Sequence, residues 1–271
     1  MQDLIRWKDS ANRKPLLLFG ARQVGKSYLI EQFAKENYQS FALLNFEEDP
    51  RLAHAFDGSL EPGNVISNLS QILDLSLDAR NMLFVFDEVQ ASNRALSALK
   101  YFQESGFPNP VIAAGSLLGV AVNQKDYSPP VGKVNTMTLY PMTFEEFMEA
   151  TGHGRMLEGI RDAYEKKSAF QLHDQAMDLY RAYLLVGGMP EAVEAYASSG
   201  DVRDAAKVHR DVLNLYLADM AKYASSAVDV ARARDVWNSV PGQLAKENRK
   251  FQYKQVRSGG RSNQYEGAIS W

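Results

Sequence analysis

One stretch of eight residues constrains this chain more than any other. Residues 20–27 follow the pattern G-x-x-x-x-G-K-[ST], which is typical of a loop that binds phosphate. An apolar run at 15–19 precedes the loop, as in a short buried strand, and apolar residues at helical spacing follow it. The predicted nucleotide-binding residues are Gly20, Ala21, Arg22, Gln23, Val24, Gly25, Lys26 and Ser27.

The residue types in this loop predict its chemistry. Gly20 and Gly25 let the backbone curl so that successive N–H groups point at an anion. The helix that begins near Lys26 directs the positive end of its dipole at the same point. We expect the Lys26 ammonium to contact the β- and γ-phosphates of a nucleotide and the Ser27 hydroxyl to hold Mg²⁺. ATP and Mg²⁺ are therefore the predicted cofactors, although phosphate contacts alone leave the choice between ATP and GTP open.

A second motif follows at residues 82–88, where five apolar residues end in Asp87 and Glu88. A continuous apolar run is typical of a buried parallel strand, and the carboxyl ends of such strands face the ligand crevice. We expect Asp87 to hold Mg²⁺ through water, opposite Ser27. Glu88 is the residue expected to orient and polarise the attacking water. Together the two motifs predict hydrolysis of the nucleotide.

Two further positions have a functional and a plain structural interpretation. The buried run at 110–116 ends in Ser116, which we expect to contact the γ-phosphate or the attacking water; the alternative is an ordinary strand-to-loop turn. The stretch 119–143 alternates apolar and polar residues, as in a β-ribbon or last strand. Lys133 lies at the start of that strand and either faces the nucleotide or is an ordinary surface lysine.

Composition excludes several classes of function. The 271 residues include no cysteine, so disulfides, thiolate chemistry and cysteine-based zinc sites are excluded. The four histidines are scattered, without metal-ligand spacing. No apolar stretch approaches the roughly 18 residues of a membrane-spanning helix, and the charged N-terminus is unlike a signal peptide. We therefore expect a cytoplasmic protein that has no membrane partner.

A basic segment lies near the end of the chain, although the net charge of −3 gives no global sign of nucleic-acid binding. Residues 246–261 contain one acidic residue, Glu247, and the aromatic residues Phe251 and Tyr253. Basic and aromatic residues interleaved in this way predict binding to a DNA backbone. A solvated basic surface is the alternative. The basic residues are Lys246, Arg249, Lys250, Lys254, Arg257 and Arg261.

The chain changes character near residue 150. Strand and helix patterns alternate before this point, and helix patterns dominate from about 155 onward. The predicted fold class is an α/β P-loop NTPase, a three-layer sandwich with a mainly parallel sheet and an additional strand between the two motifs. An all-α, winged-helix-like region is expected to follow. The predicted domains are 1–150 and 151–271, and the apolar residues at 267–271 suggest a fragment of a longer protein.

Several motifs together resemble a prokaryotic family of ATPases of the AAA+ superfamily whose C-terminal part has no known function. The resemblance spans nearly the whole chain. It rests on Gly-Ala-Arg-Gln-Val-Gly-Lys-Ser at 20–27, Asp-Glu-Val-Gln at 87–90, Gly-Ser at 115–116, and the segments 139–147, 183–191 and 240–244. Asp-Glu-Val-Gln corresponds to the Walker B motif of that family, and Gly-Ser to the end of its sensor strand.

This resemblance implies an AAA+-type ATPase core at 1–150 and a helical, winged-helix-like part at 151–271. It also implies a nuclease-like C-terminal domain in full-length members. One departure is Lys133, which stands where the family has arginine and lacks the planar fork of that side chain. Arg22, Arg155 and Arg181 are candidates for an arginine that acts on phosphate, and a neighbouring copy in a homo-oligomer is another source.

Three functions fit these observations. The leading hypothesis is an Mg²⁺-dependent ATPase that acts as a nucleotide-driven switch, with DNA as a candidate target. The second is a nucleotide-gated scaffold or DNA-binding regulator with negligible turnover, which Glu88 disfavours. The third is a kinase acting on a small molecule. It is disfavoured because nothing after Ser116 resembles an acceptor pocket with a basic lid.

Overall fold

The computed structural model describes residues 1–77, 80–116, 132–223, 226–247 and 250–270. The chain divides into two compact units, Met1–Pro190 and Glu191–Trp271, which are described separately. The strands all lie in the first unit, and the described part of the second unit is helical. The predicted domain boundary near residue 150 marks the end of the alternating strands and helices, whereas this division lies at residue 190. The boundary near 150 therefore stays a prediction.

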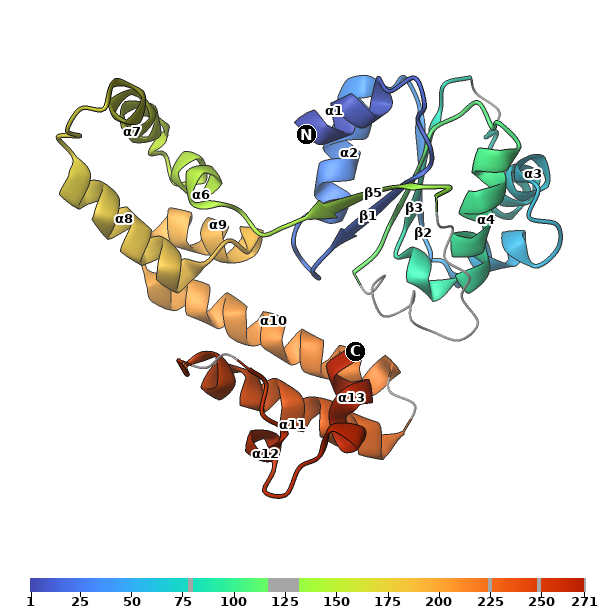
Figure 1. Ribbon diagram of the computed structural model, residues 1–271. Coiled ribbons are helices and arrows are strands. Elements are labelled where there is room, and N and C mark those ends of the chain that lie inside the picture. Colours follow the sequence, from blue (N-terminus) through green and yellow to red (C-terminus); the bar gives the residue numbers. More distant parts are fainter. Residues whose placement is uncertain (78–79, 117–131, 224–225, 248–249, 271) are drawn as a thin grey trace. The chain divides into compact units, whose positions relative to one another are not determined.

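A five-stranded sheet forms the centre of the first unit (Figure 1). Its order is β2-β3-β4-β1-β5, and every neighbouring pair is parallel. β4 therefore lies between β1 and β3, which confirms the additional strand predicted between the two motifs. The strands are β1 (Leu16–Gly20), β2 (Phe41–Asn45), β3 (Leu83–Asp87), β4 (Val111–Ala114) and β5 (Asn135–Leu139).

β5 lies within the stretch 119–143, for which the sequence predicted a ribbon or a last strand. It is a last strand, paired in parallel with β1 from Leu16↔Asn135 to Gly20↔Leu139. Val131 and the rest of 117–131 lie outside the described residues. Because β5 runs parallel to β1, its carboxyl end lies beside the phosphate-loop motif, and its start lies at the opposite edge of the sheet.

Helices cover both faces of the sheet, which explains why the strands are continuous apolar runs. Leu16 and Leu18 point to the face that also buries α1 and α2, whereas Leu17 points to the face that buries α3 and α4. Successive side chains of a strand point to opposite faces, and helices shield both faces from water. The helices are α1 (Gln2–Lys8), α2 (Lys26–Asn37), α3 (Pro62–Leu73) and α4 (Asn93–Glu104), with 3₁₀ turns η1 (Pro50–Phe56) and η2 (Val89–Ala91).

Aromatic rings fill the core on the α3 and α4 face. Phe86 of β3 lies 5.9, 5.8 and 5.9 Å, centroid to centroid, from Phe46, Phe56 and Phe102, each in an edge-to-face arrangement. This geometry places the positive edge of one ring on the negative face of the next. The cluster packs the end of β3 against the residue that follows β2, against η1 and against α4.

Three helices follow β5 within the first unit: α6 (Phe144–Ala150), α7 (Gly154–Lys166) and α8 (His173–Val186). A capping box begins α6, with the Thr143 hydroxyl and the Glu146 carboxylate each bonded to the other's backbone N–H. The Tyr183 hydroxyl donates to the Met142 carbonyl at 2.9 Å, and the Met142 N–H donates to the Gly188 carbonyl at 2.7 Å. These bonds fasten the turn after α8 to the start of α6.

The second unit contains most of α9 (Pro190–Ser199), and α10 (Val202–Tyr223), α11 (Ala227–Leu244), α12 (Tyr253–Val256) and α13 (Ser262–Ser270). Tyr216 of α10 stacks on Trp237 of α11 with ring centroids 5.7 Å apart. α11 continues through Pro241 to Leu244, where the buried Gln243 side chain bonds Ser239 and Gln252. No strand occurs in the described residues after 190, so the winged-helix expectation is not confirmed.

Within the described residues, none of the helices combines the length and the apolar character needed to cross a membrane.

Phe84→Ala tests the contribution of the sheet core to stability. The Phe84 side chain is fully buried in β3, so we expect its truncation to lower the free energy of unfolding by about 3–5 kcal/mol. Leu43→Ala is the matched control, because Leu43 lies on the neighbouring strand but is 43% exposed. Urea denaturation followed by circular dichroism measures both variants. Equal, small shifts of the two midpoints would contradict the prediction.

Candidate nucleotide-binding site

The phosphate-loop motif connects β1 to α2. β1 ends at Gly20 and α2 begins at Lys26, with Gly25 in the left-handed region at φ 94° as the residue before the helix. Gln23 also has a positive φ of 59°, which is uncommon for a residue with a side chain. A Cβ on Gly20 would lie 2.7 Å from the Leu139 carbonyl oxygen of β5. Gly20 is therefore needed for the close approach of a neighbouring strand, a reason that the motif alone does not reveal.

The Lys26 side chain folds back into this loop. It is only 5% exposed, and its Nζ donates to the carbonyl oxygens of Gly20 at 3.0 Å and Ala21 at 2.9 Å. Burial lowers the Lys26 pKa, and the nearby Arg22 acts in the same direction, while Glu88 and Asp87 raise it. The ammonium is thus partly stripped of water and held by weak partners, which phosphate oxygens could replace.

Ser27 and Asp87 come together from the two motifs. The Ser27 hydroxyl donates to Asp87 Oδ2 at 2.7 Å, across 60 residues of sequence. Asp87 is 3% exposed, and burial raises its pKa, as does the neighbouring Glu88; hydrogen bonds from Ser27 and from the Glu88 N–H oppose this shift. A buried carboxylate with a hydroxyl beside it offers the hard oxygen ligands that Mg²⁺ prefers. A divalent cation here would offset the burial of the charge, so the residues present fit the ion.

Glu88 follows Asp87 at the carboxyl end of β3 and has a backbone φ of 47°, in the left-handed region. Its Oε2 accepts hydrogen bonds from the Ser116 N–H and the Ser116 hydroxyl, both at 3.3 Å. β4 pairs with β3, and this pairing brings Ser116 to the same edge of the sheet. The structure therefore places Lys26, Ser27, Asp87, Glu88 and Ser116 in one connected group.

Gln90 belongs to the same group, although the sequence predicted no role for it. Its Nε2 donates to Glu88 Oε2 at 2.6 Å, from the 3₁₀ turn η2 that follows β3. The only sign of this contact in the sequence is the spacing Glu-x-Gln directly after a buried strand. Residues two apart meet only in a tight turn, and propensity does not reveal such a turn here.

Lys133 lies away from this group. Its Nζ is 3.0 Å from Glu104 Oε1, and it precedes the first residue of β5, at the edge of the sheet opposite the loop. Of the two interpretations of Lys133, this position agrees with an ordinary surface lysine and not with a residue that faces the nucleotide, because β5 runs parallel to β1. Among the candidate arginines, Arg181 is paired with Asp178 at 2.6 Å, Arg155 is exposed on α7, and Arg22 lies in the loop.

The turn after α8 also lies beside the loop. A Cβ on Gly25 would be 3.7 Å from Cγ of Pro190, which is ordinary contact distance. A Cβ on Gly188 would be 2.1 Å from the Met142 carbonyl oxygen, so no other residue fits at this position without a shift of the backbone. The position of this turn next to the phosphate-loop motif is not apparent from the sequence.

Comparison with known families agrees with this geometry. The sequence model of a family described as an AAA domain matches residues 12–148. The chain belongs to this AAA-domain family. A second model, described as a domain of unknown function (DUF8612), matches residues 177–271. This AAA protein is therefore a P-loop NTPase of the kind expected from the resemblance, with a C-terminal region of a separate family.

A solved structure shows the same fold. A Walker-type ATPase of Pyrococcus abyssi is 19% identical, with a TM-score of 0.54 over 99% of this chain and 88% of that one. The ORC2 protein of Aeropyrum pernix is 14% identical, with a TM-score of 0.45 over 98% and 81% of the two chains. No curated protein sequence proved similar enough to count as a relative.

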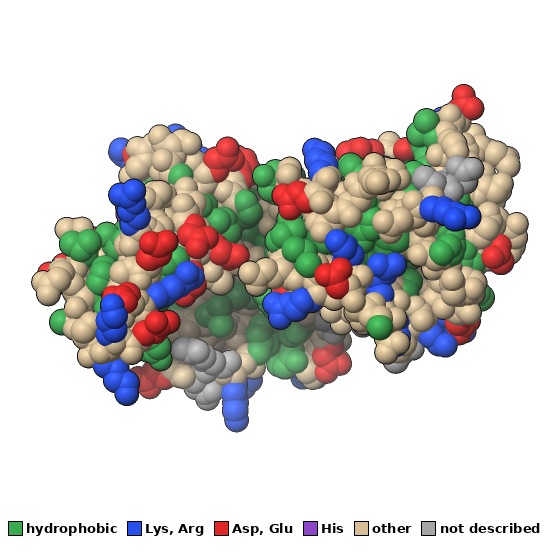
Figure 2. Space-filling view, turned by 90° about the horizontal axis from the view of Figure 1, so that it is seen from above, with side chains coloured by type: hydrophobic (Ala, Val, Ile, Leu, Met, Phe, Trp, Pro, Cys, Tyr) green, Lys and Arg blue, Asp and Glu red, His purple; other side chains and the backbone are tan. Residues whose placement is uncertain are grey.

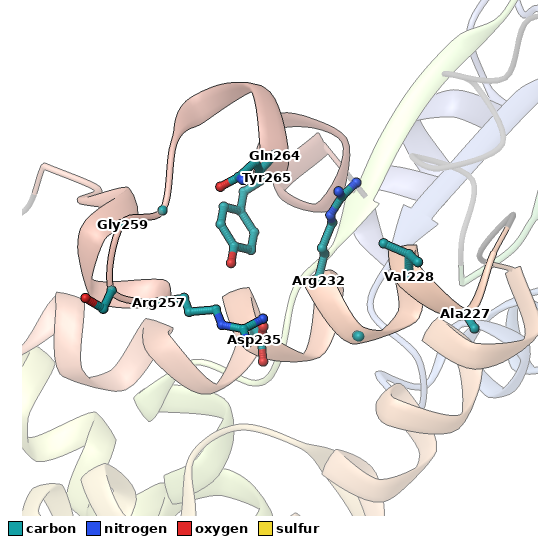
Figure 3. A pocket seen from close by; sticks show the side chains of 11 residues that line it. Ala227, Val228, Arg232, Asp235, Arg257, Gly259, Gln264 and Tyr265 are labelled. Atoms are coloured by element: carbon teal, nitrogen blue, oxygen red, sulfur yellow. The ribbon is translucent and has the colours of Figure 1, made fainter.

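A cavity of about 550 Å³ lies within the helical unit (Figure 3). Arg257 extends across it from the loop after α12 toward Asp235 of α11, and the Tyr265 hydroxyl points into the space. Arg232 of α11 also lines the cavity and forms a long ion pair, 3.8 Å, with Asp229. The lining combines two guanidinium groups with hydrogen-bonding side chains, and its remaining members include Ser258, Gly259 and Gln264.

Asp87→Asn tests the charge burial in the first site. The folded protein holds the Asp87 proton more tightly than the unfolded chain does. Wild-type stability is therefore full below the ordinary aspartate pKa of about 3.9 and falls as the pH rises through the raised pKa. Asparagine avoids this loss. Without Mg²⁺ and nucleotide, we expect the stability of the variant relative to wild type to be greater at about pH 7.5 than at about pH 4.5. Urea denaturation at both pH values measures the stability difference between variant and wild type. A difference that is the same at both pH values, or smaller at pH 7.5, would refute the burial of charge at Asp87.

Proposed function

We propose that this AAA protein binds Mg²⁺ and ATP at the loop 20–27 and hydrolyses the nucleotide. The observation that carries the proposal is the hydrogen bond between Ser27 and Asp87. It joins the two motifs at the carboxyl edge of a parallel sheet, where ligands of such sheets bind. Glu88 and Ser116 lie next to this pair, so a group able to orient water adjoins the place where phosphate and metal would meet.

Each side chain has a proposed role. Lys26 would exchange the carbonyl oxygens of Gly20 and Ala21 for phosphate oxygens, and the loop N–H groups would hold the rest of the phosphate chain. Ser27 and Asp87 would hold Mg²⁺, which when bound supplies charge stabilisation for the phosphates. Glu88 would orient the attacking water, and Ser116 would contact that water or the γ-phosphate.

A nucleotide-driven switch is the proposed use of this hydrolysis. Pro190 lies beside Gly25 of the loop, and α9 begins at Pro190. A shift of the loop on nucleotide binding would therefore reach the first residue of a helix that leads into the second unit. Assembly into a homo-oligomer, with an arginine supplied by a neighbouring copy, stays a prediction.

Glu88→Gln separates binding from hydrolysis. Glutamine keeps the size of the side chain but cannot polarise water as a base, so we expect phosphate release to fall by about 100-fold or more. ATP affinity, measured by titration calorimetry with Mg²⁺, should change little. Lys26→Ala is the contrasting variant and should lose ATP binding itself. Tight ATP binding with no phosphate release from wild type would favour the nucleotide-gated scaffold instead of the ATPase.

DNA binding is the second candidate function, and the cavity in the helical unit favours it. Arg257 lines the cavity and is exposed, and Arg232 adds a guanidinium from α11; Lys254 is exposed on the neighbouring α12. Figure 2 shows basic and acidic side chains interspersed over the face in view. The proposal therefore does not rest on a broad positive surface. Local contacts from this basic segment to backbone phosphates do support it. Arg249, part of the predicted stretch 246–261, lies outside the described residues.

Arg257→Gln and Arg232→Gln test this second function. If each arginine contacts one backbone phosphate, each variant should weaken DNA binding and reduce the slope of log K against log salt concentration by about 0.9. Lys207→Gln is the control, because Lys207 is an exposed basic residue paired with Asp204 at 2.6 Å on α10. Fluorescence anisotropy of a labelled duplex measures all three. Equal effects of the three variants, or none, would refute the role of the cavity.

A further inference from the structure

Glu88 is anchored in an unusual way. Three donors bond to one of its carboxylate oxygens, Oε2: the Gln90 amide at 2.6 Å, and the Ser116 N–H and hydroxyl at 3.3 Å. Among the described residues, no donor bonds to the other oxygen, Oε1. The carboxylate is therefore fixed through one oxygen, and the second is left for a reacting molecule. The Gln90 bond is the shortest of the three.

The backbone at this point requires an anchor. Glu88 has a positive φ of 47°, which costs a residue with a side chain roughly 1 kcal/mol or more. The 3₁₀ turn η2 follows immediately, and its tight winding brings the Gln90 side chain back over Glu88. A glutamate side chain has three rotatable bonds, so a fixed carboxylate needs contacts of this kind.

Gln90 also carries an unsatisfied group. Its Oε1 is buried and accepts no hydrogen bond from the described residues. A buried carbonyl without a donor is unfavourable by about 1–3 kcal/mol, whereas an apolar residue at this position would avoid that term. The amide is thus a poor choice for stability alone. Its favourable contribution is the Nε2 bond to Glu88.

We propose that Gln90 is a positioning residue for hydrolysis. Its amide holds Glu88 Oε2, so that Oε1 faces the attacking water. This inference rests on the proposed ATPase function, because it assigns a residue to that reaction. Ser116 bonds the same oxygen through its backbone N–H as well as its hydroxyl, so the Gln90 amide is the anchor that a side-chain substitution can remove completely.

Gln90→Ala is the test for turnover. Freeing the Glu88 carboxylate should lower kcat by about 10- to 100-fold, because small displacements of a reacting group have effects of this size. The KM for ATP should stay within about twofold, since the side chain acts on Glu88 and not on phosphate. Gln90→Glu should be at least as slow, because it places a second carboxylate where the donor stood. Gln71→Ala is the control, an exposed glutamine on α3 that bonds only Ser67, and should behave as wild type.

A double-mutant cycle tests the contact without requiring turnover. Gln90→Ala, Glu88→Ala and the double variant are compared by their urea midpoints, and direct contact predicts non-additive shifts, because each alanine removes one partner of the hydrogen bond. Non-additive midpoints with a loss in kcat alone support the proposal. Additive midpoints, or a kcat in Gln90→Ala equal to wild type, overturn it. If wild type binds ATP but releases no phosphate, the ATPase function fails, and non-additive midpoints then show that Gln90 holds Glu88 for another purpose, which overturns the catalytic role.

Discussion

The hydrogen bond from Ser27 to Asp87 is the contact on which the candidate site depends. It forms only because β1 and β3 are parallel strands separated by β4, so that their carboxyl ends meet at one edge. The same arrangement buries Asp87 and raises its pKa, which makes the carboxylate a poor solution for stability. A hard cation compensates for such burial. The fold therefore holds a charge that is best satisfied by a ligand.

Local sequence signals were sufficient for much of this arrangement. The loop 20–27, the acidic pair after β3 and the capping box at Thr143 were predictable, because each depends on residues close in sequence. The position of Ser116 was predictable as well, since parallel strands end at one edge. The sequence left two interpretations of Lys133 open. The parallel direction of β5 decides between them, because it puts Lys133 beside Glu104 at the far edge of the sheet.

Other features depend on contacts that no local pattern encodes. Gly20 is required by the Leu139 carbonyl of β5, more than a hundred residues away in sequence. Gly188 is required by the backbone of Met142, so the turn after α8 is fitted to the start of α6. Gln90 reaches Glu88 through a 3₁₀ turn that the local sequence does not predict. In the helical unit, hydrogen bonds of the buried Gln243 side chain favour the continuation of α11 through Pro241 to Leu244.

The central claim is that Mg²⁺ and ATP bind together at the edge where Ser27 meets Asp87. The most direct measurement is the midpoint of thermal unfolding of the protein with ATP and Mg²⁺, compared with the midpoint with ATP and a chelator. A ligand that binds only the folded state raises stability with its concentration, by about 2.7 kcal/mol at 100 times Kd. The account predicts a clear rise with Mg²⁺ and ATP and a much smaller rise when the metal is removed. An equal rise under both conditions, or none, would contradict it.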